Sequence, residues 1–168
     1  MKQIISREEF VIKSAAKDNM VVSGYASVFG VVDSHNDIIM RSAFGDASQK
    51  INIKFLWQHD QSKPIGVITS LMEDDYGLYV EGSINGSTQQ GREAIALIEQ
   101  GALNGLSVGF MTKDSGYNEG GSREIIKADL YEISLVTFPA NTEAGISKIS
   151  SALDKAASAL ERITGAHF

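Results

Sequence analysis

The sequence predicts a mostly β fold, a barrel or a sandwich, decorated by two or three helices. Strand-like patterns dominate the chain up to about residue 138, and only two segments have the apolar spacing of a helix. With 16 Gly and 2 Pro, the chain is divided by turns, mostly at glycine. The 168 residues are enough for one domain with its own core and hardly enough for two.

Composition excludes several classes of protein. Hydrophobic residues make up 43% and charged residues 21%, which is typical of a globular protein and excludes a disordered or collagen-like chain. The absence of cysteine excludes a disulfide, a thiolate nucleophile and a cysteine zinc site. The net charge of −6, the lack of a long apolar run and the polar N-terminus predict a soluble domain that is not secreted and binds neither nucleic acid nor a membrane.

Alternation and β-branched content predict strands over residues 20–29, 51–57, 65–71, 78–84, 105–112 and 130–138. In residues 51–57 every odd position is apolar, whereas Asn52 and Lys54 are polar, which predicts a strand buried on one face. The turn at residues 73–77 predicts a hairpin, and a polar, glycine-rich loop at residues 113–123 joins the last two strands.

The first helical segment follows residues 87–90, Ser-Thr-Gln-Gln, which have the form of a capping box. Apolar residues then recur on one face until Gly101, which predicts a helix over about residues 88–100.

The second helical segment lies near the C-terminus, where apolar residues recur every three or four positions from Ile149 to Ile163. Its Ala- and Ser-rich composition differs from the rest of the chain, so we expect one domain over residues 1–146 and a helical arm over residues 147–168. We expect the apolar stripe of the arm, including Leu153 and Leu160, to dock on the barrel or on a second protomer.

Three histidines are candidates for chemistry. His167 lies one residue from the end of the sequence, where chains fray, and is interpreted as a solvated residue. His35 lies between Asp33 and Asp37 in a run of turn-forming residues, DSHND. These three side chains are of types found in metal sites, but such a run is far more often a turn, so we expect no metal.

His59 is expected to end the alternating strand, two residues beyond Trp57, and it precedes a polar turn. If the alternation persists, its ring lies on the side of Phe55 and Trp57, at the mouth of the core. An imidazole in that place can exchange protons near neutral pH. The alternative is a histidine at a strand end whose ring is satisfied by a turn carbonyl.

Ser107 lies in the strand that begins GLSVGF, with Gly105 and Gly109 two positions to either side. It faces away from Leu106 and Val108, on a side where the glycines leave space for another backbone to approach. A nucleophile needs such clearance, and a crowded strand crossing that admits only Gly and Ser is the alternative. The G-x-S-x-G pattern does not indicate a hydrolase nucleophile elbow, because the elbow requires a strand-to-helix turn.

Glu132 interrupts the strand at residues 130–138, whose apolar residues occupy both alternating positions and predict burial on both faces. A carboxylate buried without a partner is costly, so Glu132 needs a cationic or hydrogen-bonding neighbour. A catalytic histidine that it orients is one such neighbour, and a structural ion pair with Lys or Arg is another. Ser134 lies on the same face of the strand and is a second candidate nucleophile.

Together these segments resemble the prohead maturation proteases of tailed bacteriophages. The matching motifs, in the order of the family, are GYASVF at 24–29 with Asp33 and DII at 37–39, FLWQHD at 55–60 with PIG at 64–66, GL at 77–78, GLSVGF at 105–110 and EISLVTFPAN at 132–141. One departure is MRSAF at residues 40–44, where a Pro-Gly-Ala-Phe-like segment is expected, and it concerns a turn.

The resemblance implies a closed β-barrel like that of herpesvirus assemblin, surrounded by two or three helices. It also implies a serine endopeptidase in which His59 is the general base, Ser107 the nucleophile and Glu132 the acid that orients the base. Neither a metal nor another cofactor is implied. In the herpesvirus branch the oxyanion site follows the third residue, but residues 138–141 here contain no arginine, so backbone amides would have to replace it.

The resemblance further implies a biological setting. The substrates would be the scaffolding region of the major capsid protein and the peptidase itself, in the interior of an assembling procapsid in the host bacterial cytoplasm. The chain would form a homo-oligomer, with a dimer as one form. Two other functions stay open: an inactive capsid-assembly module, in which His59, Ser107 and Glu132 do not converge, and a ligand-binding barrel with a large apolar cavity.

Overall fold

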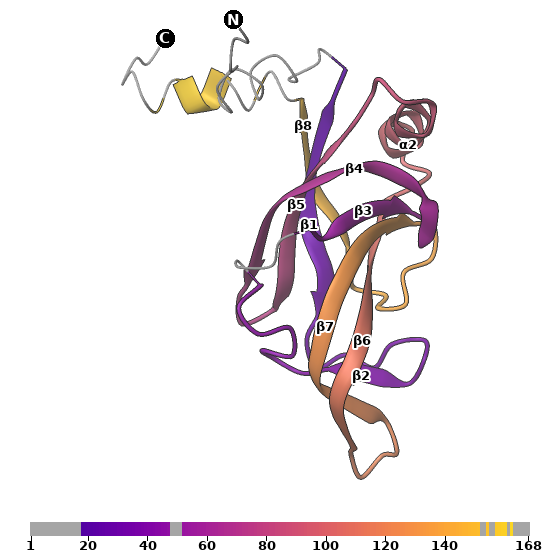
Figure 1. Ribbon diagram of the computed structural model, residues 1–168, viewed down its shortest axis with the longest axis vertical. Helices are drawn as coiled ribbons and strands as arrows, with labels where there is room; N and C mark the ends of the chain where they lie inside the picture. The colour runs from indigo at the N-terminus through magenta and orange to yellow at the C-terminus, as the bar shows by residue number, and fades with distance from the viewer. Residues whose placement is uncertain (1–17, 48–51, 152–153, 155–156, 161, 163–168) are drawn as a thin grey trace, which may run out of the picture.

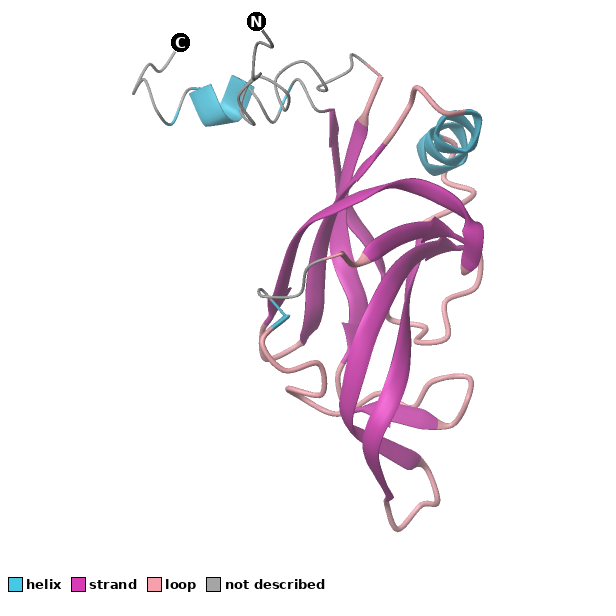
Figure 2. Ribbon diagram, viewed as in Figure 1, coloured by secondary structure: helices cyan, strands magenta, loops and turns pink. Residues whose placement is uncertain are grey.

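The computed structural model describes residues 18–47, 52–151, 154, 157–160 and 162. Strands make up most of this part of the chain (Figure 2). In chain order its elements are β1 (Met20–Val28), β2 (Asp37–Ile39), β3 (Lys54–Trp57), β4 (Asp60–Glu73), β5 (Gly77–Ile84), α2 (Gln89–Glu99), β6 (Gly105–Tyr117), β7 (Arg123–Val136) and β8 (Gly145–Ser151).

The strands form a closed barrel (Figure 1). Neighbouring strands follow the order β7-β3-β4-β5-β1-β8-β6, and the pairing of β6 with β7 closes the barrel. The short β2 lies outside this circuit and pairs in parallel with the beginning of β7. β3 also pairs with β7 in parallel, whereas the other described pairs are antiparallel. The mostly β fold and the closed barrel expected from the sequence are confirmed.

The core of the barrel is apolar, and Phe55 and Leu78 are among its fully buried side chains. Near its C-terminal end β7 is buried on both faces, because residues 133–135 are all 0% exposed. This burial agrees with the apolar residues in both alternating positions of that strand. The departing segment at residues 40–44 forms a turn that places Phe44 in the core, edge-on to Phe110 with ring centroids 5.9 Å apart.

α2 lies beside β4 and β5 at one end of the barrel (Figure 1). Its N-cap is Thr88 rather than Ser87, because the Thr88 hydroxyl accepts a hydrogen bond from the Gly91 N–H at 3.0 Å. Ala94 and Ile98 are buried on the inner face of the helix, so α2 covers this end of the core.

The C-terminal region continues the barrel before it becomes helical. β8 pairs with β1 and therefore crosses residue 146, where the change of composition suggests that the arm begins. The described residues beyond β8 are helical, and Leu160 among them is 60% exposed. No helix in the described part of the chain is long and apolar enough to cross a membrane. Outside the described residues lie Leu153, Ile163 and His167.

Candidate active site

His59 lies in a tight turn rather than in a strand. β3 ends at Trp57, which pairs with Asp60 at the start of β4, so that Gln58 and His59 alone connect the two strands. Both residues have positive φ, 51° for Gln58 and 60° for His59. The alternation therefore stops at Trp57, and the expectation that it extends to His59 is wrong. A two-residue turn with this geometry normally contains Asn and Gly. Because Gln58 and His59 occupy it here, we infer that contacts with the surrounding structure impose the conformation.

The hydrogen bonds that impose this turn come from the end of β7 and the residues after it. The Gln58 N–H donates to the Leu135 carbonyl at 2.9 Å, and the Gln58 side chain exchanges hydrogen bonds with the side chain and N–H of Thr137 at 2.7 and 3.2 Å. The His59 N–H donates to the Ser134 hydroxyl at 3.1 Å. The position of His59 is therefore fixed relative to β7.

His59 and Glu132 are in direct contact. His59 Nδ1 lies 2.5 Å from Glu132 Oε1, and the Glu132 side chain is only 13% exposed, whereas that of His59 is 45% exposed. Because a carboxylate only accepts hydrogen bonds, His59 Nδ1 carries the proton when the ring is neutral, and Nε2 is then the basic nitrogen. The hydrogen bond to Glu132 raises the pKa of His59 above 6.5, against the opposing effect of partial burial.

Gly109 makes room for the Glu132 carboxylate. The two residues are paired across β6 and β7, and a Cβ at position 109 would overlap the carboxylate of Glu132. The glycine that flanks Ser107 in the sequence thus leaves space for the side chain of the acid. Sequence reasoning expects a backbone to approach there instead.

Ser107 lies on β6 and is 6% exposed. It lines a cavity of about 280 Å³ together with His59, His35, Ala140 and Asn141, of which the last two belong to the expected oxyanion stretch. Ser107 and His59 form no hydrogen bond with each other in the described part of the chain. Hydrogen bonds between a nucleophile and its base often form only when substrate binds. What the structure gives is that the two side chains line the same cavity.

Ser134, the second candidate nucleophile, lies directly opposite Ser107 in the register of β6 and β7. It is 0% exposed, and its hydroxyl donates to Glu132 Oε2 at 2.7 Å. The hydroxyl proton is therefore committed to the carboxylate. Of the two serines, Ser107 is the one that lines the cavity.

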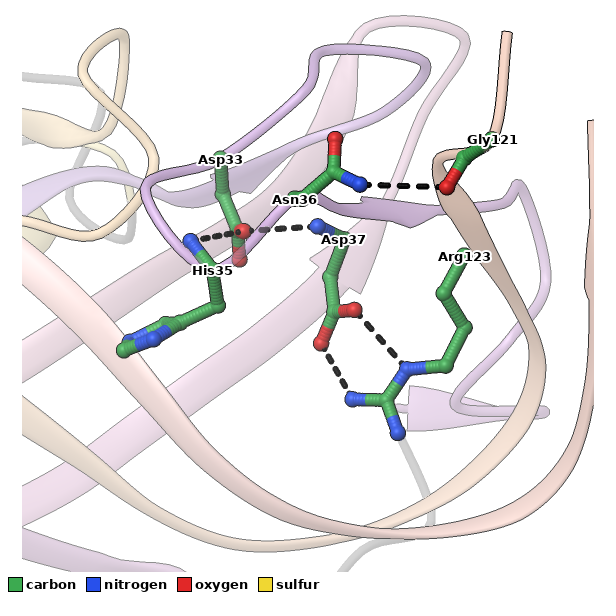
Figure 3. A network of polar contacts seen from close by, with 6 residues as sticks. All are labelled: Asp33, His35, Asn36, Asp37, Gly121 and Arg123. Atoms are coloured by element: carbon green, nitrogen blue, oxygen red, sulfur yellow. Dashed lines mark hydrogen bonds and ion pairs between the residues drawn. The ribbon is translucent and has the colours of Figure 1, made fainter.

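Asp33, His35 and Asp37, in the loop at residues 33–37, line the cavity. Figure 3 shows the polar contacts of this loop. Asp33 Oδ1 accepts hydrogen bonds from the backbone N–H groups of His35 and Asp37 at 2.8 and 2.9 Å, which is the turn that the sequence predicts. Asp37 binds Arg123 through two hydrogen bonds, at 2.8 and 2.5 Å. Within the described residues, no group of three or more acidic or histidine side chains is arranged to hold a metal ion.

Sequence reasoning misses Arg123 in this region, and it names Asn141 only as part of the expected oxyanion stretch, without the contact that Asn141 makes. Asn141 is buried, and its side chain donates to the Val28 carbonyl at 2.8 Å and so joins the loop after β7 to β1. A buried aspartate at position 37 predicts a cationic partner, but nothing in the sequence indicates that this partner is Arg123.

The sequence matches the family described as Caudovirus prohead serine protease over residues 8–158. It is 37% identical over 136 residues to the prohead protease of Enterobacteria phage HK97, an alignment that covers 78% of this chain and 60% of that protein. It is 32% identical over 138 residues to the prohead protease of Escherichia phage T5, covering 79% of this chain and 64% of that protein. The chain therefore spans less than two thirds of the length of these relatives.

Solved structures share the barrel. The KSHV protease, crystallised with a hexapeptide phosphonate inhibitor, matches with a TM-score of 0.55 and 11% identity, over 89% of this chain and 78% of that one. The capsid assembly protease of bacteriophage T4 matches with a TM-score of 0.53 and 12% identity, over 69% of this chain and 82% of that one. At these identities the likeness concerns the fold alone. Since the family match extends over most of the sequence, the chain belongs to the Caudovirus prohead serine protease family.

Proposed function

We propose that this chain is a serine endopeptidase of phage capsid maturation, in which His59 is the general base, Ser107 the nucleophile and Glu132 the acid that orients the base. The observation that carries the proposal is the 2.5 Å contact between His59 Nδ1 and Glu132 Oε1, beside the cavity that His59 shares with Ser107. An inactive module would not need these side chains to converge. Membership of the family supports the same reaction.

The mechanism follows from the protonation of His59. With Nδ1–H bound to Glu132, Nε2 takes the Ser107 proton as Ser107 Oγ attacks the carbonyl carbon of a peptide. Nε2 then gives this proton to the amine as the C–N bond breaks, which leaves an acyl-enzyme. Water repeats the sequence: its oxygen bonds to the acyl carbon, one of its protons passes through Nε2, and Ser107 departs with that proton. The Glu132 carboxylate stabilises the imidazolium in both halves.

As substrates we propose the scaffolding region of the major capsid protein and the peptidase itself, inside the assembling procapsid in the bacterial cytoplasm. The HK97 and T5 relatives are named prohead proteases, which supports a capsid substrate. A relative from Pseudomonas phage PAJU2, 30% identical over 147 residues, is named a capsid polyprotein, and the match covers 21% of it. A peptidase-like stretch within a capsid polyprotein supports cleavage of the enzyme's own chain.

We also propose that the chain forms a homo-oligomer. The exposed Leu160 on the helical residues after β8 supports a contact through the C-terminal arm. Removing residues 152–168 leaves β8 intact and should change the oligomeric state, measured by sedimentation, without changing the His59–Glu132 contact. An unchanged oligomeric state would contradict this role of the arm.

A serine-directed phosphonylating reagent tests the nucleophile. In the wild-type chain it should attach to Ser107 and stop cleavage of capsid protein that carries its scaffolding region, whereas Ser107→Ala should neither be labelled nor cleave. Ser23→Ala is the matched control, because Ser23 is a buried β1 serine that bonds to Tyr79 rather than to the site. Attachment to Ser134, or no attachment to any serine of a folded chain, would contradict the assignment.

A further inference from the structure

Ser134 joins the base and the acid through a single hydroxyl group. Its Oγ donates to Glu132 Oε2 at 2.7 Å and accepts the backbone N–H of His59 at 3.1 Å. Ser134 is 0% exposed, so no solvent competes for these hydrogen bonds. Glu132 uses its other oxygen for His59 Nδ1, which closes a hydrogen-bonded ring made of His59, Ser134 and Glu132.

The direction of each hydrogen bond in this ring is forced. A backbone N–H can only donate and a carboxylate can only accept, so the Ser134 proton points to Glu132 and its lone pair to His59. The ring therefore fixes His59 at two points, its main-chain nitrogen and the Nδ1 of its imidazole. Two points of attachment determine the direction of Nε2, which is the atom that must reach Ser107.

The backbone of His59 makes this attachment necessary. With φ of 60° at His59 and 51° at Gln58, the turn occupies a region that residues with a Cβ disfavour. The hydroxyl of Ser134 accepts the N–H of the residue that carries the base, and this residue is one of the two strained ones. Without that acceptor, only the hydrogen bonds of Gln58 hold the turn, and the His59 half of it can relax and carry the imidazole with it.

We propose that Ser134 is a positioning residue that holds the His59 turn and the Glu132 carboxylate in their catalytic arrangement. The inference rests on the proposed peptidase function. It goes beyond that function because it assigns the second serine of the site to the orientation of the base rather than to nucleophilic attack. Ser134 touches neither substrate nor the reacting atoms, and acts through His59 and Glu132.

The test compares Ser134→Ala with wild type in the full chain. We expect kcat to fall on the order of 10- to 100-fold, with KM nearly unchanged, because a misplaced base loses rate rather than substrate affinity. Ser23→Ala, the matched loss of a buried serine hydroxyl that bonds to Tyr79, should keep the wild-type kcat. Equal kcat values for Ser134→Ala and wild type would overturn the proposal.

A spectroscopic measurement separates positioning from a merely structural role. In protein labelled with ¹⁵N-histidine, the short His59 Nδ1–H···Glu132 bond should give a proton resonance far downfield of ordinary imidazole N–H signals. The resonance should disappear or broaden in folded Ser134→Ala and persist in Ser23→Ala. A sharp, unchanged resonance in folded Ser134→Ala would refute the positioning role. This readout does not depend on activity, so it stays valid even if Ser107 fails to react with the phosphonylating reagent.

Amide hydrogen exchange in the wild-type chain tests the same ring even if Ser134→Ala does not fold. The His59 N–H lies in an exposed turn, yet it should be protected because it donates to Ser134. Rapid exchange of this amide in the wild-type chain would contradict the proposal.

Discussion

Replacing Gly109 with alanine should push the Glu132 carboxylate away from His59. The new Cβ would overlap Glu132 Oε1, the oxygen that bonds to His59, and would lie 2.7 Å from the carboxyl carbon; since ordinary contact begins at 3.4 Å, the carboxyl group must retreat by more than about 0.7 Å. Since a misplacement of about 1 Å can cost about 100-fold in rate, we expect kcat to fall between about 10- and 100-fold.

The pH dependence of the Gly109→Ala variant should shift in a definite direction. The hydrogen bond that His59 donates to Glu132 is the main cause of the raised pKa of His59, so weakening it lowers that pKa. The active base is the unprotonated imidazole, and the acidic limb of kcat/KM against pH should therefore move to lower pH while the plateau falls.

Gly116→Ala is the matched control, because it lies on the same strand and its new Cβ would meet only Ile126 at 3.8 Å, an ordinary contact. This control should keep both the rate and the pH midpoint of the wild type in a peptide cleavage assay. A folded Gly109→Ala variant with wild-type kcat and an unchanged acidic limb would refute the role of Gly109 as the residue that leaves space for Glu132.

Four further outcomes are expected. Glu132→Gln should lower kcat on the order of 100-fold or more with an unchanged circular dichroism spectrum. Adding Glu132→Gln to Ser107→Ala should cause almost no further loss of kcat, because the residues act as one unit. Near-normal turnover of Glu132→Gln would leave only a dyad of His59 and Ser107. The extra stability that comes with the raised pKa of His59 should be fully present below pH 6.5 and be lost as the pH rises through that raised pKa, because the protonated ring gains most from Glu132. Urea unfolding of wild type and His59→Ala should therefore differ less in alkaline solution, and a difference independent of pH would contradict this. Asp37→Asn weakens the ion pair between Asp37 and Arg123, which holds the cavity-lining loop at residues 33–37. This variant should raise KM more than it lowers kcat, and an unchanged KM would show that the loop does not contact substrate. EDTA should leave cleavage unchanged, and activity lost in EDTA and restored by a divalent ion would reveal a metal.

Local sequence pattern predicts β1, β3, β4, β5, β6 and β7 at least in part and names the candidate residues, but it misses β2 and β8. Apolar residues in both alternating positions around Glu132 predict a strand buried on both faces, and a carboxylate in such a strand needs a partner, which in the structure is His59. The turn at His59 is different, because a two-residue turn without Asn or Gly carries no local signal and its geometry is imposed by β7.

Long-range contacts explain what the sequence does not predict. Ser134 lies 75 residues from His59, and Arg123 lies 86 residues from Asp37. Both contacts depend on the parallel register of β7 with β3 and β2, and no spacing of residues within one segment determines that register. The sequence can therefore name Ser134 as a rival nucleophile, but it cannot show that its hydroxyl is occupied.

The parallel pairing of β3 with β7 also has a consequence for synthesis of the protein. Glu132 and Ser134 are carried by β7, whereas the His59 turn follows β3, and the chain between them forms much of the barrel. Contacts at such sequence separation require a large loss of chain entropy and form slowly compared with local hairpins. A nascent chain on the ribosome therefore has no assembled catalytic centre until β7 has emerged and paired. The order of synthesis therefore prevents the proposed protease from acting before the barrel closes.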